Sequence, residues 1–155
     1  MKNKTFIIAE AGVNHNGEID LAKKLVVNAA QIGADAIKFQ TFSAKKIVTK
    51  NSSLAKYQKK NTKVNQSQYS LLKKLELNYS DHKTLIKCCK KNQIEFISSP
   101  FDLDSAKMLI KLGLKKIKIP SGEITNYQLL DYLSKIDIEL IISTGMTTSN
   151  EIRDA

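Results

Sequence analysis

The sequence predicts an α/β protein that forms the first part of a (β/α)8 barrel of the TIM-barrel type, with about five of its eight β/α units. Short apolar runs rich in β-branched residues alternate five times with helical stretches. Polar and charged side chains gather at the ends of these runs, where such barrels carry their functional groups. The 155 residues have the length of a single domain. Because five units cannot close the barrel, we assign residues 1–155 to one incomplete barrel domain.

Each expected strand is a short apolar run, which is typical of a parallel sheet covered by helices. The five strands are expected at residues 5–9, 34–40, 94–98, 116–119 and 138–142. The turn at residues 12–17 contains two glycines but neither a GxGxxG pattern nor a P-loop. Its pattern therefore argues against the competing architecture, a doubly wound sheet that binds a nucleotide.

Helical periodicity fills the connections between the strands. The first helix places Ala22, Leu25, Val26 and Ala29 on one face and should end at Gly33. The polar stretch 41–68 predicts a long excursion with a helical piece near 54–59, followed by helices at 69–75 and 80–92. The expected residues that cap or end the later helices are Ser80, Asp102, Gly113, Thr125 or Asn126, and Thr148 in a capping box with Glu151.

The composition excludes several classes of protein. Hydrophobic residues make up 42% and charged residues 26%, as in ordinary globular domains. No apolar run approaches the roughly 20 residues of a membrane span. The apolar stretch near the amino terminus stops at Glu10, which is too short for the core of a signal peptide. We therefore expect a cytoplasmic protein without a membrane partner.

The net charge of +10 raises the alternative of a non-catalytic protein that binds polyanions. However, Arg153 is the single arginine, and the lysines are spread in pairs over the whole chain, which favours solvated helix faces. We therefore expect no nucleic-acid partner. Cys88 and Cys89 are adjacent and lack the spacing of metal ligands, so we expect reduced thiols.

Chemically versatile side chains stand at the carboxyl ends of all five expected strands. They are Glu10, Lys38, Gln40, Ser99, Lys118, Ser121, Glu123 and Ser143. Charged residues inside apolar strands are unfavourable unless they are paired or bind a ligand. Together, these residues predict a pocket for a small anion beside a polyhydroxylated molecule. Internal salt bridges of the lysines with Glu10 or Glu123, and turn or capping roles for the serines, are the alternatives.

Five segments closely resemble the N-terminal half of bacterial sialic acid (N-acetylneuraminate) synthases. They are residues 6–17 (FIIAEAGVNHNG), 33–42 (GADAIKFQTF), 96–101 (FISSPF), 117–123 (IKIPSGE) and 142–146 (ISTGM). Residues 57–62 are more similar to the sialate and legionaminate synthase branch than to the pseudaminate branch.

The resemblance implies a condensation of phosphoenolpyruvate with the open-chain aldehyde of an N-acetylated hexosamine. The products are a nine-carbon 2-keto acid and phosphate. The expected acceptor is N-acetylmannosamine, and a diacetylated 6-deoxy analogue, as in legionaminate synthases, is the alternative. The matching family positions imply that Lys38, Ser99, Lys118, Ser121 and Ser143 hold phosphoenolpyruvate.

Three further positions, Gln40, Asn61 and Glu123, match family residues that face the sugar. Glu123 is also a candidate to orient water or to move a proton, and Glu10 is a second candidate catalytic carboxylate without an assigned task. A different enzymatic alternative is a class I aldolase in which Lys38 or Lys118 forms a Schiff base.

The resemblance also implies a divalent cation, usually Mn²⁺, held by two histidines in later strands that this chain lacks. Its only histidines are His15, expected to be structural, and His82, expected on the surface of an outer helix. The C-terminal antifreeze-like domain of the family is missing as well. We therefore expect the chain to be inactive alone and the full-length enzyme to be a homodimer.

Overall fold

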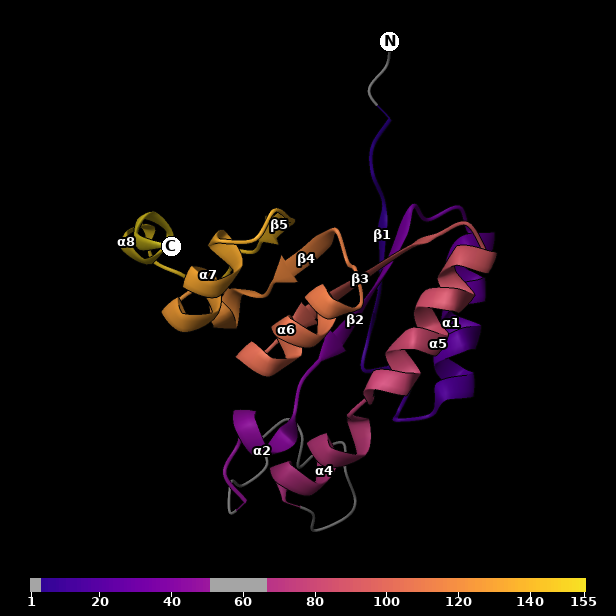
Figure 1. Cartoon of the computed structure of the whole chain (residues 1–155), viewed down its shortest axis with the longest axis horizontal. Helices are drawn as coiled ribbons and strands as arrows, with labels where there is room; N and C mark the ends of the chain where they lie inside the picture. Colours follow the sequence, from indigo (N-terminus) through magenta and orange to yellow (C-terminus); the bar gives the residue numbers. More distant parts are fainter. Residues whose placement is uncertain (1–3, 51–66) are drawn as a thin grey trace.

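The computed structural model describes residues 4–50 and 67–155, which form a parallel sheet of five strands in the order β1-β2-β3-β4-β5. The strands are β1 (Ile8–Gly12), β2 (Ala36–Thr41), β3 (Glu95–Pro100), β4 (Lys116–Ile119) and β5 (Glu139–Ile142). Each strand pairs with the next one in the sequence, and every pairing is parallel. This is the arrangement of the first five units of a (β/α)8 barrel, as the sequence predicts (Figure 1).

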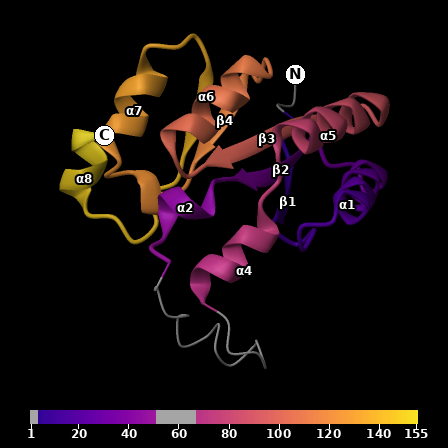
Figure 2. The ribbon, with the colours of Figure 1, turned by 60° about the horizontal axis from the view of Figure 1, so that its bottom comes forward.

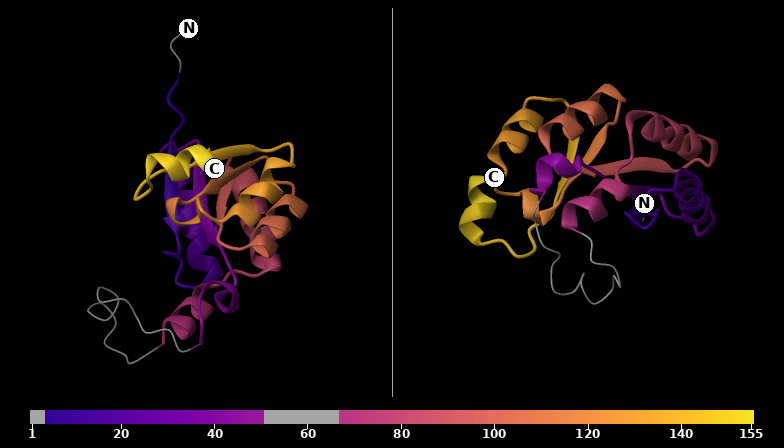
Figure 3. Two further views of the ribbon diagram at one scale, coloured as in Figure 1. Left: turned by 90° about the vertical axis from the view of Figure 1, so that its left-hand side faces the viewer. Right: turned by 90° about the horizontal axis from the view of Figure 1, so that it is seen from below.

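Helices connect the strands in the order that the periodicity predicts, and a further short helix at 44–47 lies in the polar stretch where only a helical piece near 54–59 was expected. They are α1 (Ile19–Gln31), α2 (Ala44–Ile47), α4 (Gln68–Leu75), α5 (Tyr79–Lys91), α6 (Leu103–Lys111), the 3-10 helix η1 (Ser121–Glu123), α7 (Tyr127–Ser134) and α8 (Ser149–Asp154). Figure 3 shows α1, α5, α6 and α7 around the outside of the strands. In Figures 1 and 2, α2 and α4 lie beyond the carboxyl end of β2.

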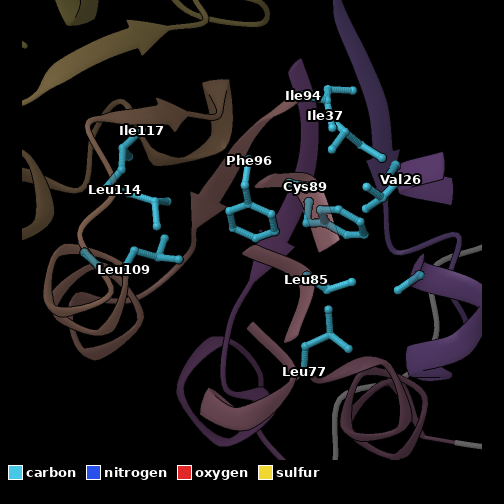
Figure 4. Close-up of a cluster of buried hydrophobic side chains, with 14 of the residues drawn as sticks. Val26, Ile37, Leu77, Leu85, Cys89, Ile94, Phe96, Leu109, Leu114 and Ile117 are labelled. Atoms are coloured by element: carbon cyan, nitrogen blue, oxygen red, sulfur yellow. The ribbon is translucent and has the colours of Figure 1, made fainter. Parts of the chain in front are cut away.

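The hydrophobic core lies between the sheet and these outer helices. Ile37, Phe39 and Phe96 are buried on the helix-covered face, and the rings of Phe39 and Phe96 stack with centroids 5.5 Å apart. Leu85 and Cys89 of α5 and Leu109 of α6 pack into the same cluster (Figure 4). Since side chains alternate along a strand, Lys38, Gln40 and Ser99 are directed to the opposite, concave face.

The described helix ends confirm several expected caps. The side chains of Asp102, Asn126 and Thr148 accept hydrogen bonds from the backbone at the starts of α6, α7 and α8. Thr148 and Glu151 form the expected capping box. These caps were predictable because a capping oxygen and the backbone N–H that it binds lie within three residues of each other.

The start of α5 corrects the sequence prediction. Ser80 does not cap this helix, because Asn78 does: its Oδ1 accepts from the Asp81 N–H at 3.0 Å, and Asp81 Oδ2 accepts from the Asn78 N–H at 2.8 Å. This reciprocal pair satisfies two free backbone donors, which a cap at Ser80 would leave to water.

One expected strand begins later in the structure, and one expected helix lies outside the described residues. β1 begins at Ile8 and contains Glu10, so the strand lies about three residues later than expected. Residues 5–7 precede the start of the β2 pairing, where Ile8 lies opposite Ala36. The expected helical piece near 54–59 lies outside the described residues. Among the helices that the structure describes, none is long and apolar enough to cross a membrane.

Candidate substrate-binding site

The first two strands bring an acid and a base together at their carboxyl ends. Glu10 of β1 lies opposite Lys38 of β2, and their side chains form an ion pair. The Lys38 side chain is 14% exposed, whereas that of Glu10 is 55% exposed. The alternative of a salt bridge with Glu10 is therefore confirmed for Lys38, whose side chain is mostly covered, whereas the Glu10 carboxylate is more exposed.

Gln40 lies next to the same pair. A Cβ atom at Gly12 would lie 3.4 Å from Glu10 Oε1 and 3.8 Å from Gln40 Nε2. Both polar groups therefore approach the backbone of Gly12, whose φ of +53° suits glycine. A carboxylate, an ammonium and an amide group therefore lie close together at the carboxyl ends of β1 and β2.

Lys118 of β4 belongs to the same electrostatic environment. Burial lowers the pKa of Lys118, the positive charge of Lys38 lowers it further, and Glu10 acts in the opposite direction. Its Nζ donates to the Ile119 carbonyl at 2.9 Å, and in the described part of the chain no carboxylate forms a salt bridge with it. A half-buried ammonium that lacks a carboxylate partner favours an anionic ligand.

Lys116 shows what a neutralised lysine in the same strand looks like. Its Nζ lies 3.4 Å from carboxylate oxygens of both Glu95 and Glu139, at the amino ends of the strands. The two lysines of β4 point to the same face, but only Lys118 stands at the carboxyl end. Of these two lysines, the one without a carboxylate partner among the described residues thus stands at the end of the sheet where barrels bind their ligands.

Ser99 adds an unused hydroxyl to this region. Ser99 lies opposite Gln40 in the pairing of β2 and β3, and it is 2% exposed. Its Oγ is one of two buried side-chain polar atoms of the described residues that have no hydrogen-bond partner. Such a group is unfavourable in the interior unless a ligand or water satisfies it. Ser99 therefore has no turn or capping role.

The remaining predicted residues lie on the connections after β4 and β5. Ser121 Oγ would lie 3.9 Å from a Cβ atom at Gly145, so these two connections approach each other. The Ser143 N–H donates to the Ile119 carbonyl at 3.0 Å, which places Ser143 at the end of β5. Glu123 Oε2 accepts from Asn126 Nδ2 at 2.7 Å. The structure shows no direct contact of Ser121, Ser143 or Glu123 with Lys38.

Asn61 lies outside the described residues, so its predicted role stays a prediction. One contact in this region was missed by the sequence analysis. Asn126 holds Glu123 while capping α7, and the Glu-x-x-Asn spacing was the available sign of this contact.

Of the two predictions for the histidines, one agrees with the structure and the other is wrong. His15 is fully buried, and its Nδ1 accepts from the Gly17 N–H at 3.0 Å, in agreement with the structural role expected for it. His82 was expected on the surface, but it is fully buried under β2 and β3. That prediction is wrong because α5 turns its first-turn histidine inward, on the same face as Leu85 and Cys89.

No metal centre is formed by the described residues. Groups of three or more His, Cys, Asp or Glu side chains that could hold a metal ion do not occur among them. Both histidines lie on the helix-covered face, away from Lys38 and Lys118. Within residues 4–50 and 67–155, the side chains therefore do not fit a bound divalent cation.

Comparison with known proteins identifies the family. Residues 25–155 match the NeuB family. The chain belongs to this family. Two relatives are named N,N'-diacetyllegionaminic acid synthase: the Campylobacter jejuni protein is 51% identical over 98% of this chain and 46% of its own length, and the Legionella pneumophila protein is 51% identical over 97% and 42%.

A solved structure supports the same assignment for this NeuB-family chain. The N-acetylneuraminic acid synthetase of Leptospira borgpetersenii, in complex with citrate, superposes with a TM-score of 0.82 at 31% identity, over 98% of this chain and 48% of that one. The chain therefore spans a little under half the length of these relatives. The predicted family and the predicted incomplete barrel are both confirmed.

Proposed function

We propose that this chain supplies the phosphoenolpyruvate-binding part of an enzyme that condenses phosphoenolpyruvate with an N-acetylated amino sugar. The observation that carries the proposal is the buried, unpartnered hydroxyl of Ser99 on the concave face that also holds Lys38 and Lys118. Cations and a free hydroxyl donor are the groups that bind a phosphorylated carboxylate. Membership of the NeuB family supports this reaction class.

In the proposed reaction, the methylene carbon of phosphoenolpyruvate attacks the aldehyde carbon of the sugar and forms the new C–C bond. Positive charge develops at C2 of phosphoenolpyruvate, water adds there, and the C2–O bond to phosphate breaks. A 2-keto acid and inorganic phosphate result. The lysines and serines at the strand ends would hold the phosphate and carboxylate, and Glu10 would limit the excess positive charge beside Lys38.

Gln40, Asn61 and Glu123 are proposed to face the sugar. The bond from Asn126 fixes one oxygen of Glu123 and leaves the other for a water or a hydroxyl. The two relatives at 51% identity are both named N,N'-diacetyllegionaminic acid synthase, whereas the N-acetylneuraminic acid synthetase of Leptospira borgpetersenii is 31% identical. This difference favours the diacetylated 6-deoxy acceptor over N-acetylmannosamine.

The divalent cation is proposed only for the complete enzyme. Its ligands are proposed to lie in the later strands of that enzyme, and the described residues of this chain offer no suitable cluster. For the same reason we propose that the 155-residue chain binds phosphoenolpyruvate without turning it over.

Calorimetric titration of phosphoenolpyruvate into the 155-residue chain tests the binding step. Lys118→Met should weaken binding at least tenfold, because one charge-assisted hydrogen bond contributes about 1.5–3 kcal/mol. Lys115→Met is the matched control, since Lys115 is exposed and lies outside the strand end, and it should leave the Kd unchanged. Equal affinities in the wild type and Lys118→Met would overturn the proposed site.

Activity is tested in a chimera in which this chain replaces the matching part of the Campylobacter jejuni relative. We expect phosphate release with phosphoenolpyruvate and the diacetylated 6-deoxy acceptor. A chimera that folds and binds phosphoenolpyruvate but never releases phosphate with any N-acetylated amino sugar would contradict the reaction. Keto-acid formation by the 155-residue chain alone with Mn²⁺ would contradict the proposal that this chain binds phosphoenolpyruvate without turning it over.

One observation favours a second candidate, a Schiff-base enzyme. The pKa of Lys118 is lowered by burial and by Lys38, and a lower pKa increases the fraction of neutral, nucleophilic amine. Borohydride reduction in the presence of a keto acid would trap an adduct at Lys118. Mass spectrometry without such an adduct would remove this candidate.

A further inference from the structure

A buried hydrogen-bond chain joins α5 to the carboxyl ends of β2 and β3. His82 Nε2 lies 2.8 Å from Thr41 Oγ1, and Thr41 Oγ1 lies 2.6 Å from Ser98 Oγ. The other ring nitrogen, His82 Nδ1, lies 2.9 Å from the Asn78 carbonyl oxygen. The three side chains are at most 2% exposed. Each member of the chain is therefore held by the protein rather than by solvent.

The direction of these hydrogen bonds follows from the chemistry of the groups. A carbonyl oxygen only accepts, so His82 Nδ1 carries a proton and donates to Asn78. In a neutral ring, Nε2 then accepts the Thr41 hydroxyl proton. Two acceptors face the Ser98 hydroxyl proton: Thr41 Oγ1 at 2.6 Å and, farther away, the Phe39 carbonyl oxygen at 3.2 Å. One histidine tautomer thus orients the Thr41 hydroxyl and leaves Thr41 Oγ1 as an acceptor for Ser98.

The groups around the ring favour this neutral form. Burial lowers the pKa of His82 and outweighs the opposing effects of the Asn78 carbonyl and of Asp81. His15, on the turn after β1, is coupled electrostatically to His82, and burial lowers its pKa as well. At pH 7 both imidazole rings are therefore neutral, and both lie on the helix-covered side of β2.

Thr41 and Ser98 are each adjacent in the sequence to a candidate binding residue. Gln40 precedes Thr41 and Ser99 follows Ser98, and alternation along the strands sends the members of each pair to opposite faces. We propose that His82 is a positioning residue for the binding site: through Thr41 and Ser98, it sets the orientation of Gln40 and Ser99 on the concave face. This inference rests on the function proposed above.

Two substitutions at the same position separate this role from a purely structural one. His82→Gln can present its amide oxygen near the place of Nε2 and accept from Thr41, but it cannot reach the Asn78 carbonyl at the same time. His82→Asn can donate near Asn78 but is too short to reach Thr41. Both variants should lose stability. Only His82→Asn should weaken phosphoenolpyruvate binding, by about tenfold, in calorimetry under conditions where circular dichroism shows a folded chain.

Thr41→Val serves as the second variant, because it keeps the shape of Thr41 while removing the hydroxyl. It should reproduce the tenfold loss if His82→Asn does not fold. Equal dissociation constants for wild type, the folded His82 variants and Thr41→Val would show that the hydrogen bonds from His82 to Thr41 and Ser98 are only structural. That result would overturn the inference.

NMR provides a readout that does not depend on the ligand. The Gln40 side-chain amide and the Ser99 backbone signals should shift in His82→Asn and Thr41→Val but stay near their wild-type positions in His82→Gln. If the wild type binds no phosphoenolpyruvate, the proposed function fails, and these shifts still decide the role of His82. Unchanged Gln40 and Ser99 signals in all variants would refute it.

Discussion

Two adjacent serines of β3 should respond in opposite ways to the same substitution. Ser98 faces the helices, where its Oγ lies 2.6 Å from Thr41 Oγ1 and 3.2 Å from the Phe39 carbonyl oxygen. Ser99 faces the concave side, where its buried Oγ has no partner among the described residues. Ser98→Ala and Ser99→Ala each remove one oxygen atom from a buried site, so the pair is internally matched.

The magnitudes follow from the hydrogen bonds. Ser98→Ala breaks buried contacts and should lower the free energy of unfolding by about 1–3 kcal/mol. Ser99→Ala breaks no protein hydrogen bond and removes an unsatisfied buried hydroxyl, so the free energy of unfolding should stay the same or rise by about 1 kcal/mol. With a urea m-value of about 1–3 kcal/mol/M, the unfolding midpoints of the two variants should differ by about 1 M.

Phosphoenolpyruvate binding should also distinguish the two variants. Ser99→Ala removes one hydrogen bond to a charged ligand, about 1.5–3 kcal/mol, which corresponds to about a 10- to 100-fold weaker Kd. Urea unfolding followed by circular dichroism and calorimetric titration measure the two effects separately. Loss of stability in Ser99→Ala equal to that in Ser98→Ala, with unchanged affinity, would refute the assignment of Ser99 to the ligand.

Three further predictions concern titration, capping and thiol chemistry. The pKa values of His15 and His82 are lowered in the folded chain, so the folded state binds fewer protons than the unfolded state below pH about 6.5. Stability should therefore fall as the pH drops below that value, by up to about 1.4 kcal/mol per pH unit for the His82 proton, and urea midpoints that stay constant from pH 7 to 5 would contradict this. Asn126→Ala should lower the free energy of unfolding by about 1 kcal/mol through the lost cap of α7, and Asn126→Ser should recover most of it in the same assay. Burial raises the pKa of Cys89 to about 12, so iodoacetamide should leave this thiol unmodified at pH 8 in the folded chain; rapid labelling detected by mass spectrometry would show that the site opens.

Features that depend on neighbours in the sequence were predictable. The order of strands and helices follows from apolar periodicity, and the caps at Asp102 and Thr148 follow from contacts within three residues. Asn78 and Ser80 show the limit of this reasoning. Both are good capping residues, two positions apart, and the bond that decides between them requires Asp81 at the third position after the cap.

The sequence by itself determined which groups stand at the carboxyl ends of the strands, because parallel strands bring these ends to one edge of the sheet. Only the tertiary structure decided how those groups are paired. Lys38 forms an ion pair with Glu10, while Lys118 has no carboxylate partner in the described part of the chain. Likewise, the pairing of β2 with β3 turns Ser99 to the concave face and Ser98 toward His82. A slip of one residue would exchange these roles, and registry is set by contacts between distant segments that no local pattern contains.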